Sequence, residues 1–530
     1  MQNTNGQFGM SKNAIEFINK ISQDKKVVLC LFSNPYVLNY LTNTENITAI
    51  FLAYNNSDNI QSWAAQALFG ANNISGILPI STGKFKPGVG IETPNLSRLK
   101  YLQPYEVGLN AIILSKIDSI ADTAIRANAF PGCQVLVAKN GAVVYNKAFG
   151  YQSADKNSNV TIYDVYDLAS ITKIVASITS LMYLKDQGKF NIDTTLGYYL
   201  PNLIGANKAN LAIKDVLTHR AGLKAWIPFY LSLINGFDDP LSKVLNNKRT
   251  EKYSIQIDGN LYLDKNYQLD DRFLCDYFSV DFSLPVAKNL YLSPSYIDTI
   301  YKKIDLSDVS DKKEYKYSDL GYYYIKKIIE NISSTKLDRY VDSVFYKPIG
   351  AYTMTYNPWQ KYEIQKIIPT ENDILFRKQT VRGFVHDPGA ALLGGVCGHA
   401  GVFSNANDLA KIFQCFLNDG IYGGKQYFSN ETISLFTSCV FCNYGNYRGL
   451  GFDKRNTKST KESSVPNYVS ENSYGHTGFT GTIVWADPDY ELIYIFLSNR
   501  VNPDANNKKI YRLDVRPSIH RVIYQAIENE

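Results

Sequence analysis

Short apolar runs alternate with helix-like patterns in the first hundred residues. The run 27–32 and the segment 48–54 have the length and apolar content of buried strands. Helical patterns occupy 15–21 and 60–69, and Ser33-Asn34-Pro35-Tyr36 is a turn that leads into another helix. Strands that alternate with helices predict a parallel α/β unit, which we place at residues 1–83.

Prolines punctuate the next segment. Pro87, Pro94 and Pro104 fall in a stretch without helical or strand periodicity. Since proline disfavours regular structure, we expect an extended, exposed linker over 84–108. A second domain then occupies 109–530.

The second domain begins and ends with strand patterns. A helical pattern at 112–127 precedes a hairpin, and Asn140-Gly141 between its strands is a strong type I′ turn signal. Near the C-terminus two further strands precede a last helix. The expected strands are 134–138, 142–147, 482–486 and 492–498, and the last helix is 517–527. Strands at both ends around a helical middle predict one antiparallel sheet built from both ends, with helices packed on it.

A serine and a lysine lie at the start of another helical pattern, 174–184. Lys173 is one turn from Ser170, so both side chains share a helix face, and the helix N-terminus adds partial positive charge. The spacing alone is unspecific, because Ser-x-x-Lys recurs at Ser97, Ser153, Ser310 and Ser333. The alternative is an ordinary helix start. The Ser170 copy is set apart by two motifs further along the chain, Tyr317-Ser318-Asp319 and His476-Thr477-Gly478, the second of which precedes a strand.

These motifs carry a resemblance to a known family. From about Asn110 onward the chain resembles the serine β-lactamase and penicillin-binding-protein superfamily, closest to the class C-like branch with its esterases and D-amino peptidases. Further matching stretches are 166–170, 213–219, 317–322 and 398–404. The resemblance implies an antiparallel sheet flanked by helices with an all-helical subdomain, and a serine hydrolase that forms an acyl-enzyme on an ester or amide.

A serine hydroxyl is a weak nucleophile until a base removes its proton, and no Ser-His-Asp order with a Gly-x-Ser-x-Gly elbow occurs here. Lys173 and Tyr317 are therefore the candidates for this work. Lysine titrates near 10.4 and tyrosine near 10, so one of them must be tuned by its surroundings. We assign Tyr317 as the proton shuttle and Lys173 as its electrostatic partner and co-base; which one holds the proton stays open.

The remaining site residues come from the resemblance. His476, Thr477 and Gly478 would form the wall opposite Ser170, with glycine letting substrate backbone lie close to the strand. By analogy, the backbone N–H groups of Phe479 and Ser170 would form the oxyanion hole.

Two positions depart from the family pattern. His476 replaces a lysine and is mostly neutral at pH 7. Asp319 replaces an asparagine, and we expect it to pair with Lys173 and raise the lysine pKa. Both changes favour substrates without a carboxylate beside the scissile bond.

The N-terminal part resembles the C-terminal α/β domain of family-3 glycoside hydrolases through 33–36, 65–70 and 76–80. This implies descent from a β-N-acetylglucosaminidase fused to a β-lactamase-like domain. The barrel that would hold the two glycosidase carboxylates is missing, so we expect no glycosidase activity. The fragment would serve as a docking surface, for example for a separately encoded glycosidase barrel, or persist as a relic.

The composition of the chain limits the classes of partner that it can bind. With 530 residues, 45% hydrophobic content and a net charge of +6, the chain can bury large cores and shows no nucleic-acid footprint. No apolar run is long enough to span a membrane, and Met1–Met10 lacks a signal-peptide pattern, although the family suggests a periplasmic or cell-envelope setting. We expect neither cofactor nor metal; Cys439-x-x-Cys442 is the one close pair among seven cysteines, and we favour packing or an incidental thiol over zinc or redox chemistry.

Several other residues have competing interpretations. His386-Asp387 is an enzyme-like dyad or, preferably, a turn-stabilising pair, and His399 is preferably a hydrogen-bonded structural imidazole. The long segment 226–315 is a helical lid or insertion that sets substrate choice, or a peripheral elaboration. For the whole chain, our leading hypothesis is a serine hydrolase that acts on an ester, a D-amino-acid peptide or a peptidoglycan-derived amide. The alternatives are a non-catalytic binding scaffold and a glycosidase accessory piece.

Overall fold

A computed structural model describes residues 8–457 and 464–527. The chain forms two units, one up to Tyr101 together with Tyr422–Lys425, and one made of Leu102–Ile421 and Gln426 onward. The division after Tyr101 falls inside the segment 84–108. Most of the N-terminal stretch that lacks a signal-peptide pattern, residues 1–7, lies outside the described residues.

The first unit contains a small parallel sheet. Strand β1 (Val28–Leu31) pairs in parallel with β2 (Ala49–Leu52), as the alternation of strands and helices predicts. Helices α1 (Lys12–Asp24) and α2 (Asp58–Leu68) accompany them, and the Ser11 hydroxyl caps α1. The turn after β1 leads into a 3-10 helix rather than an α-helix.

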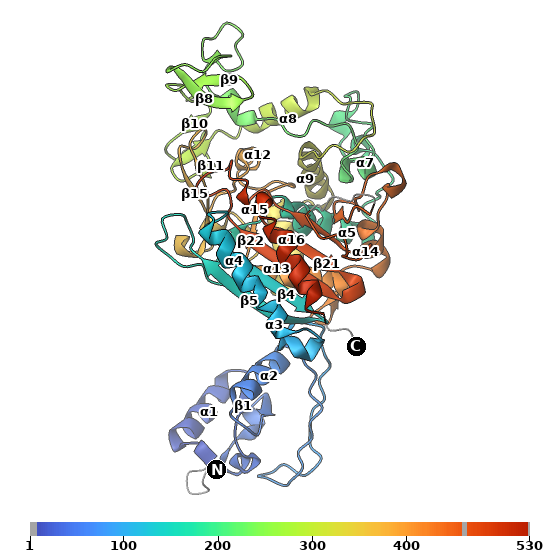
Figure 1. Ribbon diagram of the computed structural model, residues 1–530. Coiled ribbons are helices and arrows are strands. Elements are labelled where there is room, and N and C mark those ends of the chain that lie inside the picture. Colours follow the sequence, from blue (N-terminus) through green and yellow to red (C-terminus); the bar gives the residue numbers. More distant parts are fainter. Residues whose placement is uncertain (1–7, 458–463, 528–530) are drawn as a thin grey trace. The chain divides into compact units, whose positions relative to one another are not determined.

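The second unit is built on an antiparallel sheet drawn from both ends of the chain (Figure 1). Strand β22 (Leu492–Ser498) lies beside β4 (Gly132–Lys139), with Ser498 opposite Cys133. Across this sheet the order is β19 (Asp453–Lys454), β20 (Tyr474–Thr477), β21 (Ile483–Asp487), β22, β4 and β5 (Ala142–Gly150). The predicted two-ended sheet is confirmed. Asn140 and Gly141 have φ of 51° and 74°, the left-handed values that a type I′ turn requires.

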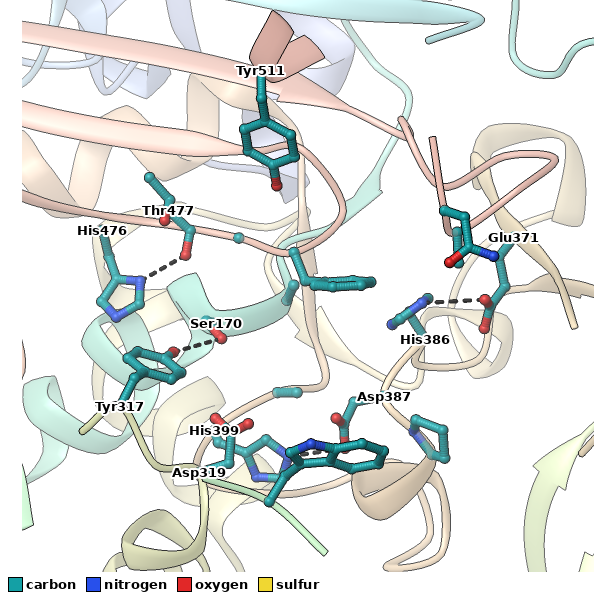
Figure 2. A pocket seen from close by; sticks show the side chains of 18 of the residues that line it. Ser170, Tyr317, Asp319, Glu371, His386, Asp387, His399, His476, Thr477 and Tyr511 are labelled. Atoms are coloured by element: carbon teal, nitrogen blue, oxygen red, sulfur yellow. Dashed lines mark hydrogen bonds and ion pairs between the residues drawn. The ribbon is translucent and has the colours of Figure 1, made fainter. Parts of the chain in front are cut away.

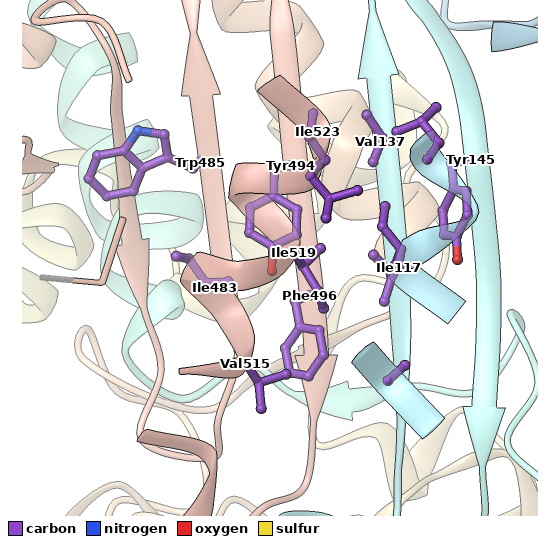
Figure 3. Close-up of a cluster of buried hydrophobic side chains, with 14 of the residues drawn as sticks. Ile117, Val137, Tyr145, Ile483, Trp485, Tyr494, Phe496, Val515, Ile519 and Ile523 are labelled. Atoms are coloured by element: carbon purple, nitrogen blue, oxygen red, sulfur yellow. The ribbon is translucent and has the colours of Figure 1, made fainter. Parts of the chain in front are cut away.

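Helices cover both faces of this sheet. On one face, α4 (Lys116–Arg126) and α16 (Val515–Gln525) contribute to a buried cluster with Val137, Tyr494 and Phe496 (Figure 3). Helix α13 (Ala406–Leu417) also packs against β4 and β22. Every residue of β22 is buried, which is why its sequence is apolar without alternation.

The helix that follows Ser170 begins irregularly. A 3-10 turn, Ala169–Ile171, leads through a π-helical stretch, Lys173–Ile178, into α5 (Thr179–Asp186). The main helix facing it is α9 (Leu320–Ser333). The remaining helices of the described unit are α3 (Ala111–Leu114), α6 (Leu196–Tyr199), α7 (Ile213–Leu217), α8 (Tyr296–Leu306), α10 (Leu337–Val341), α11 (Lys347–Ile349), α12 (Pro388–Ala391), α14 (Asn430–Thr437) and α15 (Lys509–Arg512). No helix within 8–457 or 464–527 has the length and hydropathy of a membrane span.

The prediction that the segment 226–315 is helical is wrong. Apart from α8 and a 3-10 turn, it consists of two small antiparallel sheets, of order β7-β9-β8 and β10-β12-β11. Their strands are β7 (Leu245–Asn246), β8 (Tyr253–Asp258), β9 (Leu261–Asp264), β10 (Leu274–Cys275), β11 (Leu284–Ala287) and β12 (Leu290–Leu292). The physical reason is visible in the sequence, because Tyr253–Asp258 alternates with period two and Asp258-Gly259 is a hairpin turn signal.

Short strand pairs complete the second unit. The strands β13 (Thr355–Tyr356), β16 (Val402–Ser404) and β6 (Tyr166–Asp167) form one sheet, and β14 (Pro369–Asp373) pairs with β15 (Gln379–Arg382). Of the other short strands, β3 (Lys100–Tyr101) belongs to the first unit, and β17 (Ile421–Tyr422) and β18 (Lys425–Gln426) each have one residue in either unit. Strand β6 leads directly into the turn that carries Ser170.

Cys439 and Cys442 form a disulfide, with their Cα atoms 5.7 Å apart. The expectation that they serve only packing or remain incidental thiols is therefore wrong. A tight turn at Phe441–Tyr444, closed by the Tyr444 N–H on the Phe441 carbonyl, folds the two cysteines together. A spacing of three residues does not by itself reveal such a turn.

Candidate active site

Two donors converge on the Ser170 hydroxyl. Lys173 Nζ and the Tyr317 hydroxyl each lie 2.9 Å from Ser170 Oγ. Figure 2 shows Tyr317 reaching Ser170 from the loop ahead of α9. Lys173 comes from the π-helical stretch that follows the turn of Ser170. The three residues that the sequence motifs single out thus lie within one hydrogen-bonded cluster.

The turn before Ser170 is strained and firmly held. Ala169 has a φ of 48°, a left-handed conformation that costs energy for a residue with a Cβ. Its N–H donates to Asp167 Oδ1 at 2.8 Å, and the other oxygen of that buried carboxylate accepts the His386 N–H at 2.6 Å. The Thr480 hydroxyl donates to the Asp167 carbonyl at 2.8 Å. These bonds fix the backbone that presents the serine.

Asp319 forms an ion pair with Lys173, with Oδ1 and Nζ 2.6 Å apart and the lysine fully buried. Burial alone would lower the pKa of Lys173, but the Asp319 carboxylate and Tyr317 outweigh it, so the pKa is raised. The predicted pairing and the direction of its effect on the lysine are both present. Lys173 is therefore an ammonium at neutral pH.

Tyr317 is partly buried between two imidazoles. The His219 ring lies 4.4 Å from the Tyr317 ring and the His476 ring lies 6.2 Å from it. Burial raises the pKa of Tyr317, and Lys173 only partly opposes this. Burial also lowers the pKa of His219, whose Nδ1 accepts the Ser318 N–H at 3.1 Å. The phenol is thus protonated and next to a neutral imidazole.

The pKa of His476 is lower than that of a free histidine, so its side chain is neutral over a wider pH range. Burial, together with Arg448 and Lys173, lowers its pKa to about 4, despite the opposing effect of Asp453. Its Nδ1 lies 2.7 Å from the Thr477 carbonyl, and the hydrogen bond requires the proton on Nδ1. The wall that His476 and Thr477 form beside Ser170 therefore carries no charge from the histidine.

Gly478 allows the turn after β20 to lie against the segment that carries Ser170. A Cβ at this position would meet the Thr482 hydroxyl at 2.1 Å and the Leu168 carbonyl at 2.6 Å. The glycine thus has a packing reason beyond the close approach of substrate. The next turn leaves the Phe479 N–H without a hydrogen-bond partner among the described residues. The Phe479 ring is half exposed, with Arg500 Cζ 4.5 Å from its centre.

A buried arginine lies at this site that no sequence motif marks. Arg448 lines the pocket and pairs with Asp453, and its Cζ lies 6.0 Å from the centre of the Tyr317 ring. This wall therefore holds a guanidinium paired with a carboxylate beside the neutral His476. Arg448 is distant in sequence from His476 and is brought beside it because Arg448 is bridged to Asp453 of β19, which pairs with β20.

On the other side of the pocket lie two histidine and carboxylate pairs (Figure 2). His399 Nε2 is 2.9 Å from Asp387 Oδ1, and His386 Nε2 is 3.2 Å from Glu371 Oε2. Asp387 also caps α12 through the Ala390 N–H. His399 is hydrogen-bonded as expected, but Asp387 pairs with His399 and not with His386, because the chain turns His386 toward Glu371. All four side chains line the pocket.

The pocket has a volume of about 1300 Å³, above the ~300–1000 Å³ common for ligand sites. Ser170, Tyr317 and the 476–479 wall line one part of it, and residues of the insertion, including Trp226 and Ile255, line another. The arrangement combines an approachable hydroxyl, a fixed ammonium and an unengaged N–H, which suits attack on a carbonyl carbon.

Comparison with known proteins identifies the family. A model of the beta-lactamase family matches residues 117–249 and 301–516. The chain belongs to the beta-lactamase family. As a member of it, the chain is a serine hydrolase that acts on an ester or amide bond.

Curated relatives span most of the chain. An N-acetylmuramyl-L-alanine amidase of Bacillus subtilis is 29% identical over 453 residues, which cover 78% of this chain and 89% of the relative. A putative D-alanyl-D-alanine carboxypeptidase of Escherichia coli O157:H7 is 30% identical over 438 residues, or 77% and 87% of the two chains. Among solved structures, EstCE1, a hydrolase with promiscuous acyltransferase activity, superposes with a TM-score of 0.53 at 16% identity and covers 77% of this chain and 99% of its own. That likeness confirms the predicted fold.

Proposed function

We propose that Ser170 is the nucleophile, Tyr317 the proton shuttle and Lys173 the fixed positive charge that supports it. The observation that carries this assignment is the convergence of Lys173 Nζ and the Tyr317 hydroxyl on Ser170 Oγ, both at 2.9 Å. The raised pKa of Lys173 favours its role as a cation over its role as a base.

In acylation, Ser170 Oγ bonds to the substrate carbonyl carbon while its proton passes to Tyr317. Tyr317 gives its own phenolic proton to the leaving amine or alkoxide as the scissile bond breaks. Because the pKa of Tyr317 is raised, a concerted relay that avoids a free phenolate is favoured. In deacylation, water attacks the acyl carbon, and its proton returns through Tyr317 to Ser170 Oγ as the acid is released.

Negative charge develops on the carbonyl oxygen during acyl transfer, and hydrogen-bond donors must stabilise it. We assign the Phe479 N–H and the Ser170 N–H to this role. Such donors typically lower the barrier by about 3–4 kcal/mol each. The strained turn at Ala169 and the packing of Gly478 against Leu168 hold the two segments next to each other.

For the substrate we propose a D-amino-acid peptide or another peptidoglycan-derived amide or ester. The names of the two relatives, an amidase and a putative D-alanyl-D-alanine carboxypeptidase, support this class. Arg448 places a buried guanidinium beside Tyr317, and Asp453 pairs with that guanidinium.

We further propose that the N-terminal unit derives from the C-terminal domain of a family-3 glycoside hydrolase and docks a separately encoded barrel. The parallel pair β1 and β2 with its flanking helices supports this origin. Co-purification of a glycosidase barrel with the full chain from the native organism would support the docking role. Recovery of the chain alone would count against it.

The decisive experiment is active-site labelling. A fluorophosphonate or penicillin probe should label the wild type and not Ser170→Ala, and p-nitrophenyl acetate should show burst kinetics. A matched control is Ser153→Ala, which removes the serine of an unrelated Ser-x-x-Lys spacing. Labelling that survives Ser170→Ala would refute the assignment. A folded protein with no burst on any activated ester would favour the non-catalytic scaffold.

A further inference from the structure

One wall of the pocket is the edge of a second sheet. The insertion sheet has the order β7-β9-β8, so within residues 8–457 and 464–527 strand β8 is paired on one side, by β9. Ile255, Gln256 and Ile257 of this edge strand all line the same pocket as Ser170. In an edge strand, alternate backbone N–H and C=O groups face away from the neighbouring strand and are open to a further strand.

The hairpin that carries β8 is anchored to the rest of the pocket. The Tyr267 hydroxyl donates to the Leu375 carbonyl, and the Tyr230 ring lies 5.7 Å from the Phe376 ring. Ile255 and Ile257 pack with Leu375 in one apolar cluster around the buried Leu263. These contacts fix β8 opposite the turn between β14 and β15.

Large apolar side chains in the pocket remain open to solvent. Trp226 is 58% exposed, Ile374 75% and Phe479 51%. All three line the pocket, and together they reach from the oxyanion turn to the insertion. Apolar side chains grouped in one concave site mark a surface that a ligand covers.

We propose that β8 binds an extended peptide portion of the substrate by strand addition, with the apolar side chains of that peptide covering Ile255, Ile257 and Ile374. An edge strand recognises extended backbone through main-chain hydrogen bonds, and side-chain pockets add selectivity. This occupant is favoured over a fatty acyl chain, which has no groups to pair with the backbone of β8. The inference rests on the proposed acyl transfer at Ser170. It assigns to the insertion the recognition of longer peptide substrates.

The test compares substrates of increasing length. With a series from an acylated D-alanyl dipeptide to a hexapeptide, kcat/KM of the wild type should rise with each added residue that reaches β8. N-methylation of one backbone amide in the distal part should lower kcat/KM about tenfold, because main-chain hydrogen bonds are lost. Neither result is expected of a pocket that recognises only the scissile end.

Variants connect the effect to the pocket. The change Ile374→Thr keeps a β-branched residue in the pocket but removes its apolar contact with the peptide, and should lower the ratio of long-peptide to dipeptide kcat/KM. Ile374 is 75% exposed and lies outside the cluster that anchors β8, so the hairpin keeps its packing. Val280→Thr is the matched control, since Val280 lies in the same insertion, is 89% exposed and does not line the pocket. It should leave that ratio unchanged.

Several outcomes would overturn the proposal. One is a wild type indifferent to peptide length or to N-methylation; another is a length dependence seen with p-nitrophenyl esters of fatty acids instead of peptides. Burst kinetics on p-nitrophenyl acetate, lost in Ser170→Ala, report separately on the proposed acyl transfer. A positive burst with no peptide-length effect would therefore refute strand addition alone.

Discussion

At the residue scale, the site is defined by which charges are buried together. Lys173 is an ammonium because Asp319 lies 2.6 Å away, and His476 is neutral because burial and nearby cations lower its pKa to about 4. Arg448 in the same wall is paired with Asp453. These states depend on neighbours in space, since lysine and histidine titrate quite differently when free.

The first prediction concerns Asp319→Asn. Without the carboxylate, burial dominates and the pKa of Lys173 falls, by at least about one pH unit for the loss of so close a charge. If Lys173 acts as a cation, activity requires its ammonium form, so the alkaline limb of the kcat/KM profile should shift to lower pH. The measurement is the pH dependence of p-nitrophenyl acetate hydrolysis.

The sign of this shift distinguishes the two roles of Lys173. A lysine that acts as the base would instead gain activity at lower pH in Asp319→Asn, which would contradict the cation assignment. Asp308→Asn is the control, because Asp308 pairs with Lys224 at the surface and its side chain is 90% exposed.

The raised pKa of Lys173 also links the ion pair to the pH dependence of stability. In the wild type the pair stabilises the folded protein fully below the pKa of the unfolded lysine, about 10.4. This contribution to the free energy of unfolding is lost as the pH rises through the folded pKa of Lys173.

At the scale of elements, regular pieces are more predictable from sequence than irregular ones. The hairpin of β4 and β5 has a strong turn signal and clear strand periodicity, and it is present. The insertion is expected to be helical, yet Tyr253–Asp258 carries the alternation of a strand, and that local periodicity prevails. The irregular helix after Ser170 has no sequence signal, and all residues of its π-helical stretch are buried.

The second prediction tests the turn that holds Cys439 and Cys442. Denatured without reductant, the chain should take up five iodoacetamide groups, because five cysteines are free, and seven after reduction. Intact mass spectrometry counts the groups. Seven groups without reductant would show that the disulfide does not form, and a Cys442→Ser chain should take up six in either condition.

At the scale of the whole molecule, the sheet of the second unit joins distant parts of the sequence. Strand β22 lies between β21 and β4, so residues near 495 complete a sheet that begins near 132. Phe496 is fully buried there, with the Phe130 ring 5.4 Å away in an edge-on contact. The same sheet carries His476 and Thr477, so the active-site wall depends on both ends of the chain.

The third prediction is that Phe496→Ala destabilises the second unit by about 3–5 kcal/mol, the usual range for a large aromatic side chain removed from a core. Urea unfolding followed by tryptophan fluorescence should show a lower midpoint, and active-site labelling should be lost at the same urea concentration. Phe278→Ala is the control, since Phe278 is 66% exposed. An unchanged midpoint would show that β22 does not join the two ends as described.

From the sequence alone, periodicity predicted the strands and helices of the second unit, and the motifs with Ser170, Lys173 and Tyr317 carried a resemblance to a serine hydrolase family that the family model bears out. Only the tertiary structure decided the charge states of these residues and which other residues surround them. Arg448 reaches the wall through its bridge to Asp453 of β19, which pairs with β20, and β8 reaches the pocket through the anchoring of its hairpin. Electrostatic and packing energies depend on distance in space, and local sequence patterns do not record which distant residues become neighbours.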